Sequence, residues 1–99
     1  MSIKKNDQLE KLCEAFLTLK NEKEVLRFLK DLCTPNEIDD LAERWQVCRL
    51  LEDDSLSYRD IHKICGASLT TIGRVARFLK QESHRGYLTV LNRLKKENL

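Results

Sequence analysis

The chain has 99 residues, 34% of them charged, and a formal net charge of +2. This length suits one domain with a modest core, and a content of only three glycines and one proline favours a nearly all-helical chain. No apolar run approaches the roughly 18 residues of a transmembrane helix, and the N-terminal sequence MSIKKNDQLE lacks the apolar core of a secretion signal. We therefore expect a cytoplasmic protein without membrane contact, folded as a single helical domain over residues 1–99.

The first half of the chain predicts three amphipathic helices. Apolar residues spaced three and four apart predict a helix over about residues 6–20, and Asn21 starts a second helix that runs to about residue 32. The third begins with Thr34 as its cap, Pro35 at the first helical position and Glu37 closing a capping box. The stripe of this helix that is expected to face the core comprises Ile38, Leu41, Trp45, Cys48 and either Leu51 or Glu52.

The second half predicts three shorter helices. Ser57 can cap a helix from Tyr58 to Ile64, and Gly66 can end it in the left-handed conformation. A further helix is expected from Ser68 to about Lys80, and a last one over residues 86–97.

The two helices around Gly66 match a helix-turn-helix over residues 57–80. If Tyr58 is counted as position one, Gly66 falls at position nine, where the tight turn of such a motif needs a residue that tolerates positive φ. All five interior positions are apolar: Ile61, Cys65, Ala67, Ile72 and Val75. His62 at position five is a departure, because many such motifs have a small residue there.

The charge distribution favours the same segment as a DNA-binding surface. Residues 35–54 carry seven acids against two arginines, whereas residues 57–80 carry five bases against one aspartate. Outward residues at the start of the second helix are expected to reach base edges, and the bases to contact phosphates. The candidate base-reading residues are Ser68, Leu69, Thr70, Thr71 and Gly73. The candidate phosphate-binding residues are Arg59, Lys63, Arg77 and Lys80. The alternative is an ordinary helical hairpin with a polar outer face.

Neither catalysis nor metal binding is expected. His62 and Cys65 lie one helical turn apart, but no acidic partner or oxyanion loop accompanies them. The four cysteines form no CxxC pair and no zinc-ligand pattern with either histidine, so we expect buried, reduced thiols.

The segment from Cys33 to Lys80 resembles the tryptophan repressor (Trp repressor) family, in particular its YerC/YecD-type members. The resemblance is without gaps and covers about half of the chain. It rests on these matching features: the Thr34–Pro35 helix start, Arg44, Ser57 with Arg59, Gly66–Ala67, Thr71–Ile72, Arg74 and Leu79–Lys80.

The resemblance implies a six-helix fold and an intertwined homodimer. Helices within residues 6–54 and 86–97 would form the dimer, and two recognition helices would meet a palindromic operator in double-stranded DNA. A sequence-specific transcriptional regulator follows, acting as a repressor and associating with the bacterial nucleoid when bound. A non-DNA protein-interaction module with an acidic surface over residues 37–43 stays open as an alternative.

The resemblance also implies an effector pocket. In the family the corepressor tryptophan lies between two arginines matched here by Arg44 and Arg74, near the residue matched by Thr34. Val75 and Phe78 replace a glycine and a serine of the family repressor, so their side chains are expected to fill this slot. We therefore expect no cofactor and no tryptophan dependence, with a tryptophan-responsive or other small-aromatic-responsive repressor as the alternative. The alternative role for Arg44 is a salt bridge to a nearby acid.

Overall fold

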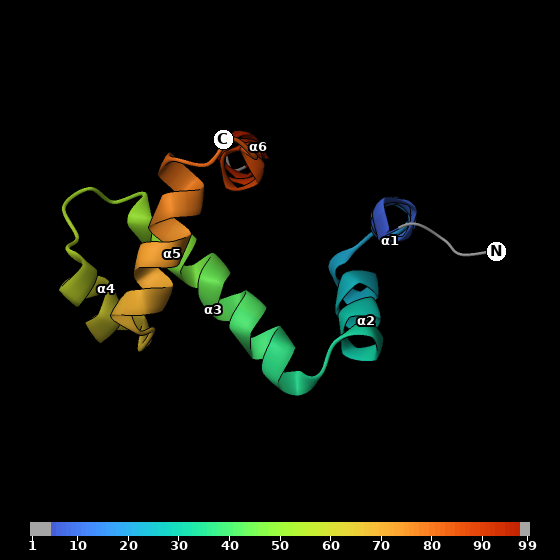
Figure 1. Cartoon of the computed structure of the whole chain (residues 1–99), viewed down its shortest axis with the longest axis horizontal. Helices are drawn as coiled ribbons and strands as arrows, with labels where there is room; N and C mark the ends of the chain where they lie inside the picture. The colour runs from blue at the N-terminus through green and yellow to red at the C-terminus, as the bar shows by residue number, and fades with distance from the viewer. Residues whose placement is uncertain (1–4, 98–99) are drawn as a thin grey trace. The chain divides into compact units, whose positions relative to one another are not determined.

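The computed structural model describes residues 5–97, which form six α-helices and no strand (Figure 1). In chain order they are α1 (Lys5–Leu17), α2 (Glu22–Leu32), α3 (Pro35–Leu51), α4 (Tyr58–Cys65), α5 (Leu69–Lys80) and α6 (Gly86–Glu97). The all-α prediction is confirmed. The first helix ends earlier than predicted, because the N–H and hydroxyl of Thr18 both donate to the Ala15 carbonyl and close a tight final turn. None of the helices in residues 5–97 has the length and hydrophobicity needed to cross a membrane.

Local capping explains why the helices begin where the sequence predicts. The Asn21 side chain accepts a hydrogen bond from the Glu24 N–H at 3.0 Å before α2. At the start of α3, Glu37 N–H donates to Thr34 Oγ1 at 3.2 Å, and Thr34 N–H donates to Glu37 Oε1 at 2.8 Å. These bonds satisfy amide groups that a free helix end would leave without a partner.

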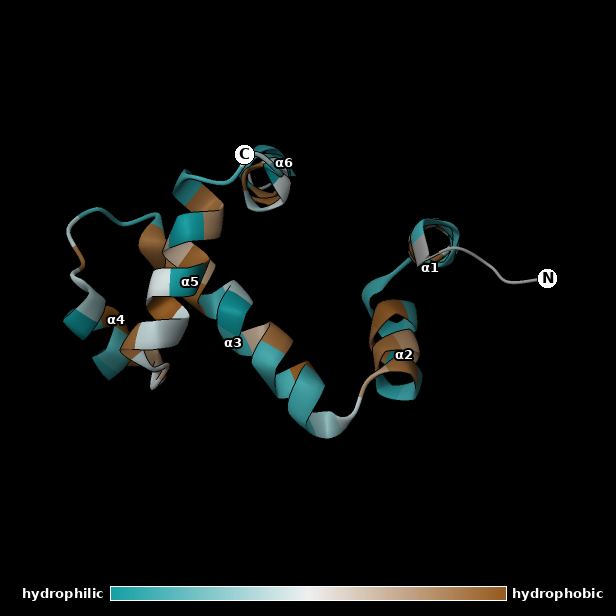
Figure 2. Ribbon diagram, in the orientation of Figure 1, coloured by the Kyte–Doolittle hydropathy of each residue, from teal (hydrophilic) through white to brown (hydrophobic). Residues whose placement is uncertain are grey.

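The described residues divide into two compact units, and the division falls within α3, between Ile38 and Asp39. The first unit contains α1, α2 and the first turn of α3. The rings of Phe16 and Phe28 pack edge to face, with centroids 5.1 Å apart. No side chain of residues 6–38 is buried, and Leu9 and Leu17 remain 61% and 84% exposed. Hydrophobic residues also cover much of the visible surface of α2 (Figure 2).

The second unit, from Asp39 onward, contains the buried core. Its α5 packs against both α4 and α6. The core residues are Val47, Cys48, Leu51, Ile61, Ala67, Ile72, Val75, Ala76, Leu79 and Leu91. Every helix of this unit therefore contributes at least one buried side chain, and α5 contributes the most.

The predicted stripe of α3 is only partly correct. Cys48 and Leu51 are buried, but Leu41 is exposed and Trp45 is half-buried at the edge of the core. Val47 is fully buried instead. The reason is that the core meets α3 only along its C-terminal half, on the face that carries Val47, Cys48 and Leu51.

The expectation of buried thiols holds for Cys48 alone. All four cysteines are free, Cys13 is exposed, and Cys33 and Cys65 are partly buried. Burial, with a smaller contribution from the charge of Glu52, raises the pKa of the Cys48 thiol to about 11. Cys48 therefore stays a protonated, apolar core residue near neutral pH.

Candidate nucleic-acid interface

A reciprocal capping box starts α4. Asp60 N–H donates to Ser57 Oγ at 3.1 Å, and Ser57 N–H donates to Asp60 Oδ2 at 2.9 Å. These hydrogen bonds, with a weaker contribution from Lys63, hold the pKa of the Asp60 carboxyl below its usual value. Asp60, the only acidic residue of residues 57–80, therefore uses its carboxylate to cap the start of α4.

The turn between α4 and α5 has the geometry that the motif requires. Gly66 adopts φ 78° and ψ −1°, and its N–H donates to the His62 carbonyl at 2.8 Å. A side chain at this φ would be strained, so the glycine serves the left-handed stop. Ala67 follows with 1% exposure and anchors the turn in the core.

Ser68 fixes the start of α5. Its Oγ accepts a hydrogen bond from the Thr71 N–H at 3.1 Å and donates to Thr71 Oγ1, also at 3.1 Å. The hydroxyl of Thr71 is thus held against the cap, and its side chain is partly buried. Leu69 and Thr70 are exposed in the same turn. The first turn of α5 therefore presents an apolar and a hydroxyl-bearing side chain beside a rigid cap.

The interior positions follow the prediction closely. Ile61, Ala67, Ile72 and Val75 have at most 1% exposure, and Cys65 is partly buried. Because these residues pack α4 against α5, the polar residues between them face the solvent. The helix-turn-helix is thus present as a packed, capped unit whose two helices lie side by side (Figure 1).

The predicted phosphate-binding residues are all on the outside of α4 and α5. Arg59 and Lys63 lie one turn apart on α4, and Arg77 and Lys80 lie on the last turns of α5. Arg77 Nε also approaches Glu82 Oε2 at 3.5 Å, so this arginine is partly engaged within the chain. Gly73 is in the middle of α5, and an added Cβ would meet nothing within 4 Å. Its lack of a side chain is therefore not needed for packing within the described protein.

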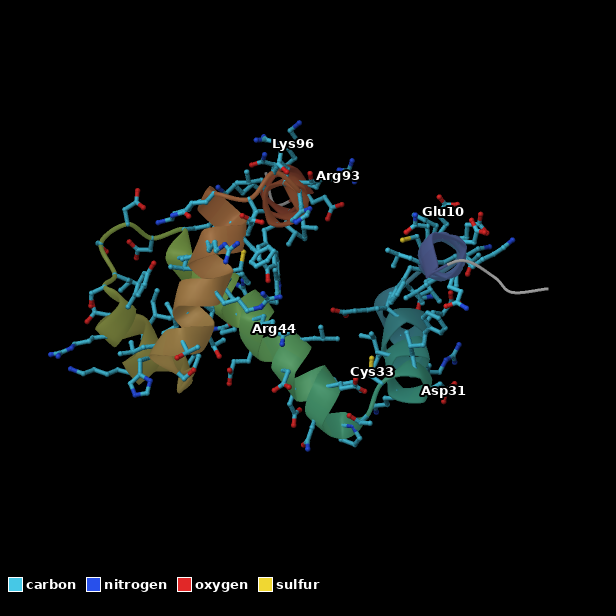
Figure 3. The ribbon with its side chains drawn as sticks, viewed as in Figure 1. Glu10, Asp31, Cys33, Arg44, Arg93 and Lys96 are labelled. Atoms are coloured by element: carbon cyan, nitrogen blue, oxygen red, sulfur yellow. The ribbon has the colours of Figure 1, made fainter. Side chains whose placement is uncertain are left out.

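The predicted effector residues are only partly brought together. Thr34 caps α3 in the first unit, and Val75 is a core residue with 1% exposure. The guanidinium carbon of Arg74 lies 4.5 Å from the centroid of the Phe78 ring. Arg44 projects from the middle of α3 (Figure 3) and is partly buried. Val75 thus serves the core of the second unit, and Phe78 lies beneath Arg74.

An open cavity of about 420 Å³ lies beside Arg74 and Phe78. Sequence reasoning missed the other side chains that line it: Trp45, His84, Tyr87 and Val90. The His84 ring stacks on Phe78, with centroids 5.9 Å apart and planes inclined by 10°. Burial raises the pKa of the Tyr87 hydroxyl, while the charges of Arg74 and Arg44 oppose this rise.

Comparison with known proteins places this geometry in a family. The sequence profile of the Trp repressor protein family matches residues 7–95. The chain belongs to the Trp repressor family. Over 88 residues it is 41% identical to YerC of Bacillus subtilis (strain 168), covering 89% of this chain and 83% of YerC.

Two solved structures resemble the chain along almost its full length. A TrpR-like protein from Eubacterium eligens ATCC 27750 has a TM-score of 0.83 and 40% identity, with 92% of each chain covered. A candidate Trp repressor from Staphylococcus aureus has a TM-score of 0.82 and 39% identity, with 89% of this chain and 86% of that chain covered. The predicted Trp-repressor-like fold is thereby confirmed.

Membership of the Trp repressor family also fixes the broad functional class. The family consists of non-enzymatic regulators, which confirms that this chain is not an enzyme and indicates a DNA-binding regulator. Within residues 5–97, no group of three or more histidine, cysteine or acidic side chains is arranged to hold a metal ion.

Proposed function

We propose that the chain is a sequence-specific transcriptional regulator that binds a palindromic operator through α4 and α5 and acts as a repressor. The observation that carries this proposal is the capped helix-turn-helix within a Trp repressor family member. Four of its five interior residues are buried, and its outer face bears basic and hydroxyl-bearing side chains. Such a regulator works in the cytoplasm and is associated with the nucleoid when bound.

The proposed contacts divide by chemistry. Arg59, Lys63, Arg77 and Lys80 neutralise phosphates and set the position of the protein on the duplex. Residues at the start of α5 lie against base edges in the major groove, where a threonine can hydrogen-bond and a leucine can touch a thymine methyl group. Exposure at Leu69 and Thr70 supports this assignment. Ser68, Thr71 and Gly73 complete the proposed reading surface.

The proposed functional unit is a homodimer in which the whole chain acts as one domain. The support comes from the first unit, whose leucines have no buried environment within the described residues. Apolar faces of this kind are stable when a partner surface covers them. A two-fold dimer would also give two copies of α5 at a spacing of about one DNA helical turn.

We further propose that DNA binding does not require tryptophan. The guanidinium carbon of Arg74 already lies 4.5 Å from the centroid of the Phe78 ring, and the Arg77 guanidinium and the His84 ring also lie against this ring. An aromatic side chain of the protein thus takes the position beside a guanidinium that an aromatic ligand would otherwise favour. Titration calorimetry with tryptophan tests this point: stoichiometric tight binding at the Arg44, Arg74 and Phe78 region would contradict it.

Fluorescence anisotropy tests the DNA-binding proposal. Fragments selected from genomic DNA are labelled and competed with unrelated duplex at physiological salt. We expect the selected fragment to bind at least about 10³-fold more tightly than the competitor, as specific regulators do. Equal binding to all fragments would reject the proposal. A protein partner captured without protection of any DNA would instead support an interaction module.

A further inference from the structure

His62 forms hydrogen bonds with both residues of the turn between α4 and α5, Gly66 and Ala67. Its main-chain carbonyl accepts the Gly66 N–H at 2.8 Å. Its ring Nδ1 lies 2.7 Å from the carbonyl oxygen of Ala67, one residue further along. A single residue of α4 therefore contacts two consecutive residues of the connection to α5.

The direction of the side-chain hydrogen bond follows from chemistry. A carbonyl oxygen can only accept, so the His62 Nδ1 must carry the proton and donate. The Ala67 carbonyl precedes the Ser68 cap and lies outside α5, and the Ile72 N–H donates the first main-chain hydrogen bond of that helix to the Ser68 carbonyl. The imidazole thus serves an acceptor that neither helix uses.

This bond restrains the least restricted part of the motif. Gly66 has no side chain and can adopt many backbone conformations, so the main chain alone leaves the direction of Ala67 and Ser68 weakly defined. The core fixes the Ala67 side chain, and His62 fixes its carbonyl. Together they set the orientation of the peptide that leads into α5.

We propose that His62 is a positioning residue that braces the turn and is required for choosing among DNA sequences. This inference rests on the proposed function, because it assigns His62 a part in reading DNA. Hydrogen bonds to base edges need the first turn of α5 to be held accurately, whereas long lysine and arginine side chains reach phosphates despite small displacements. Loss of the brace therefore weakens selective binding more than general DNA binding.

The His62 side chain contributes little to the packing of the motif apart from this hydrogen bond. The His62 residue is exposed, so its ring adds little to the core, and a small residue at this motif position would satisfy packing equally well. This explains the departure at position five of the motif. The His62 ring is long enough to reach the Ala67 carbonyl across the turn, whereas an alanine side chain is not.

The test uses two substitutions of nearly equal shape in the full-length protein. In His62→Asn the side-chain NH2 occupies about the place of Nδ1 and can donate, whereas His62→Leu has the same branching without a donor. His62→Ala, which restores the small residue common in such motifs, serves as a second donor-free variant. Thermal unfolding first checks that all three variants fold.

Hydrogen–deuterium exchange of the free protein tests the brace itself. One neutral hydrogen bond of ordinary strength corresponds to about a fivefold change in an opening equilibrium. We expect amides at the start of α5 to exchange about fivefold faster in the leucine and alanine variants, by the same estimate, and at the wild-type rate in the asparagine variant. Unchanged exchange in all variants overturns the brace.

Competitive anisotropy then tests selection. We expect the ratio of selected to unrelated DNA affinity to fall about fivefold in the leucine and alanine variants and to recover with asparagine. The salt dependence should not change. Equal losses for both DNAs, with a salt slope reduced by about one, would identify a direct phosphate contact and overturn the inference. If the wild-type protein shows no sequence preference, both the proposed function and the role of His62 in selection are wrong. The hydrogen-exchange experiment tests the His62 brace independently of that outcome.

Discussion

The two units of the chain use their apolar residues in opposite ways. The second unit buries ten residues in a core shared by α3, α4, α5 and α6. In the first unit no side chain of residues 6–38 is buried, although α1 and α2 carry regular leucine and phenylalanine positions. The second unit therefore has a core of its own, whereas the apolar side chains of the first unit stay at least partly exposed, as the proposed homodimer would require.

This contrast separates two properties that the chain must combine. The orientation of α5 depends on contacts inside the second unit, which one protomer supplies by itself. Pairing of two such units depends on the apolar faces of the first unit in the proposed homodimer. Substitutions in the two units should therefore fail in different ways.

The largest expected effect comes from emptying the core of the second unit. Ile72→Ala removes a fully buried side chain and should lower the free energy of unfolding by about 2–5 kcal/mol. Leu26→Ala, at a 47% exposed position in the first unit, should cost much less when the protein is dilute. Chemical denaturation at several protein concentrations measures both. If the two variants lose the same free energy of unfolding at every protein concentration, the two units do not differ in how they use their apolar residues.

The next effect tests the first unit as a pairing surface. Leu9→Glu places a charge on the apolar face of α1 and should weaken dimerisation at least about tenfold, because burial of a leucine is worth about 1.5–3 kcal/mol. Analytical ultracentrifugation measures the dimer fraction. Lys11→Gln is the matched control, since it also changes the net charge by one unit and lies about 200° around the helix from Leu9. Similar dissociation by both variants would show that this face is not the pairing surface.

The third pair of substitutions distinguishes phosphate contacts from base contacts. Arg59→Ala should weaken binding to all DNA sequences and reduce the salt slope by about one. Thr70→Ala should instead alter the preference at one base pair, by about 1–3 kcal/mol, with an unchanged slope. Anisotropy titrations over a range of salt concentrations separate the two. If both variants act alike on every sequence, the division of contacts is wrong.

Gly73→Ala should act in opposite directions on stability and on DNA binding. The added Cβ meets open space in the protein, so the more favourable helix propensity should stabilise it by about 0.5–1 kcal/mol. On the proposed reading face the same methyl group meets DNA and should lower affinity. Thermal unfolding and anisotropy provide the two measurements. A gain in stability without any loss of affinity would place Gly73 away from DNA.

The smallest effect concerns pH and arises at the two capping boxes that start α3 and α4. Hydrogen bonds within the capping boxes lower the pKa of Glu37 in the first unit and of Asp60 in the second. The stabilisation is therefore complete above the usual carboxyl pKa values and is lost as the pH falls below about 4. The amide NMR signals of Thr34 and Ser57 should follow these titrations. In Asp60→Asn the Ser57 signal should no longer titrate, and persistence of that titration would contradict the assignment.

Helix starts and the helix-turn-helix could be predicted because their signals are local. The free amide groups at these helix starts are satisfied within one turn of the chain, by Ser57 with Asp60 and by Ser68 with Thr71. Sequence spacing is therefore sufficient to predict where these helices begin. The glycine turn is equally local, since only its own φ matters. These features make up most of the proposed DNA-binding site.

Features that depend on distant contacts could not be predicted. Sequence periodicity does not say which part of α3 meets the core, so Val47 was missed and Leu41 was wrongly placed inside. Spacing also gives no indication that His84 stacks on Phe78, because the connection between α5 and α6 sets the direction of that ring. The His62 bond was missed for a related reason: it needs the turn geometry before the ring can reach Ala67.

Hydroxyl-radical footprinting of a selected operator fragment tests whether the protein reads DNA as a homodimer, since it reports DNA binding and pairing together. We expect two protected stretches related by two-fold symmetry, centred about 10 base pairs apart, which is one turn of the duplex. Both stretches should be lost in Leu9→Glu at concentrations where the wild-type protein protects them. Uniform or absent protection by the wild-type protein, or full protection of both stretches by a monomeric variant, would contradict it.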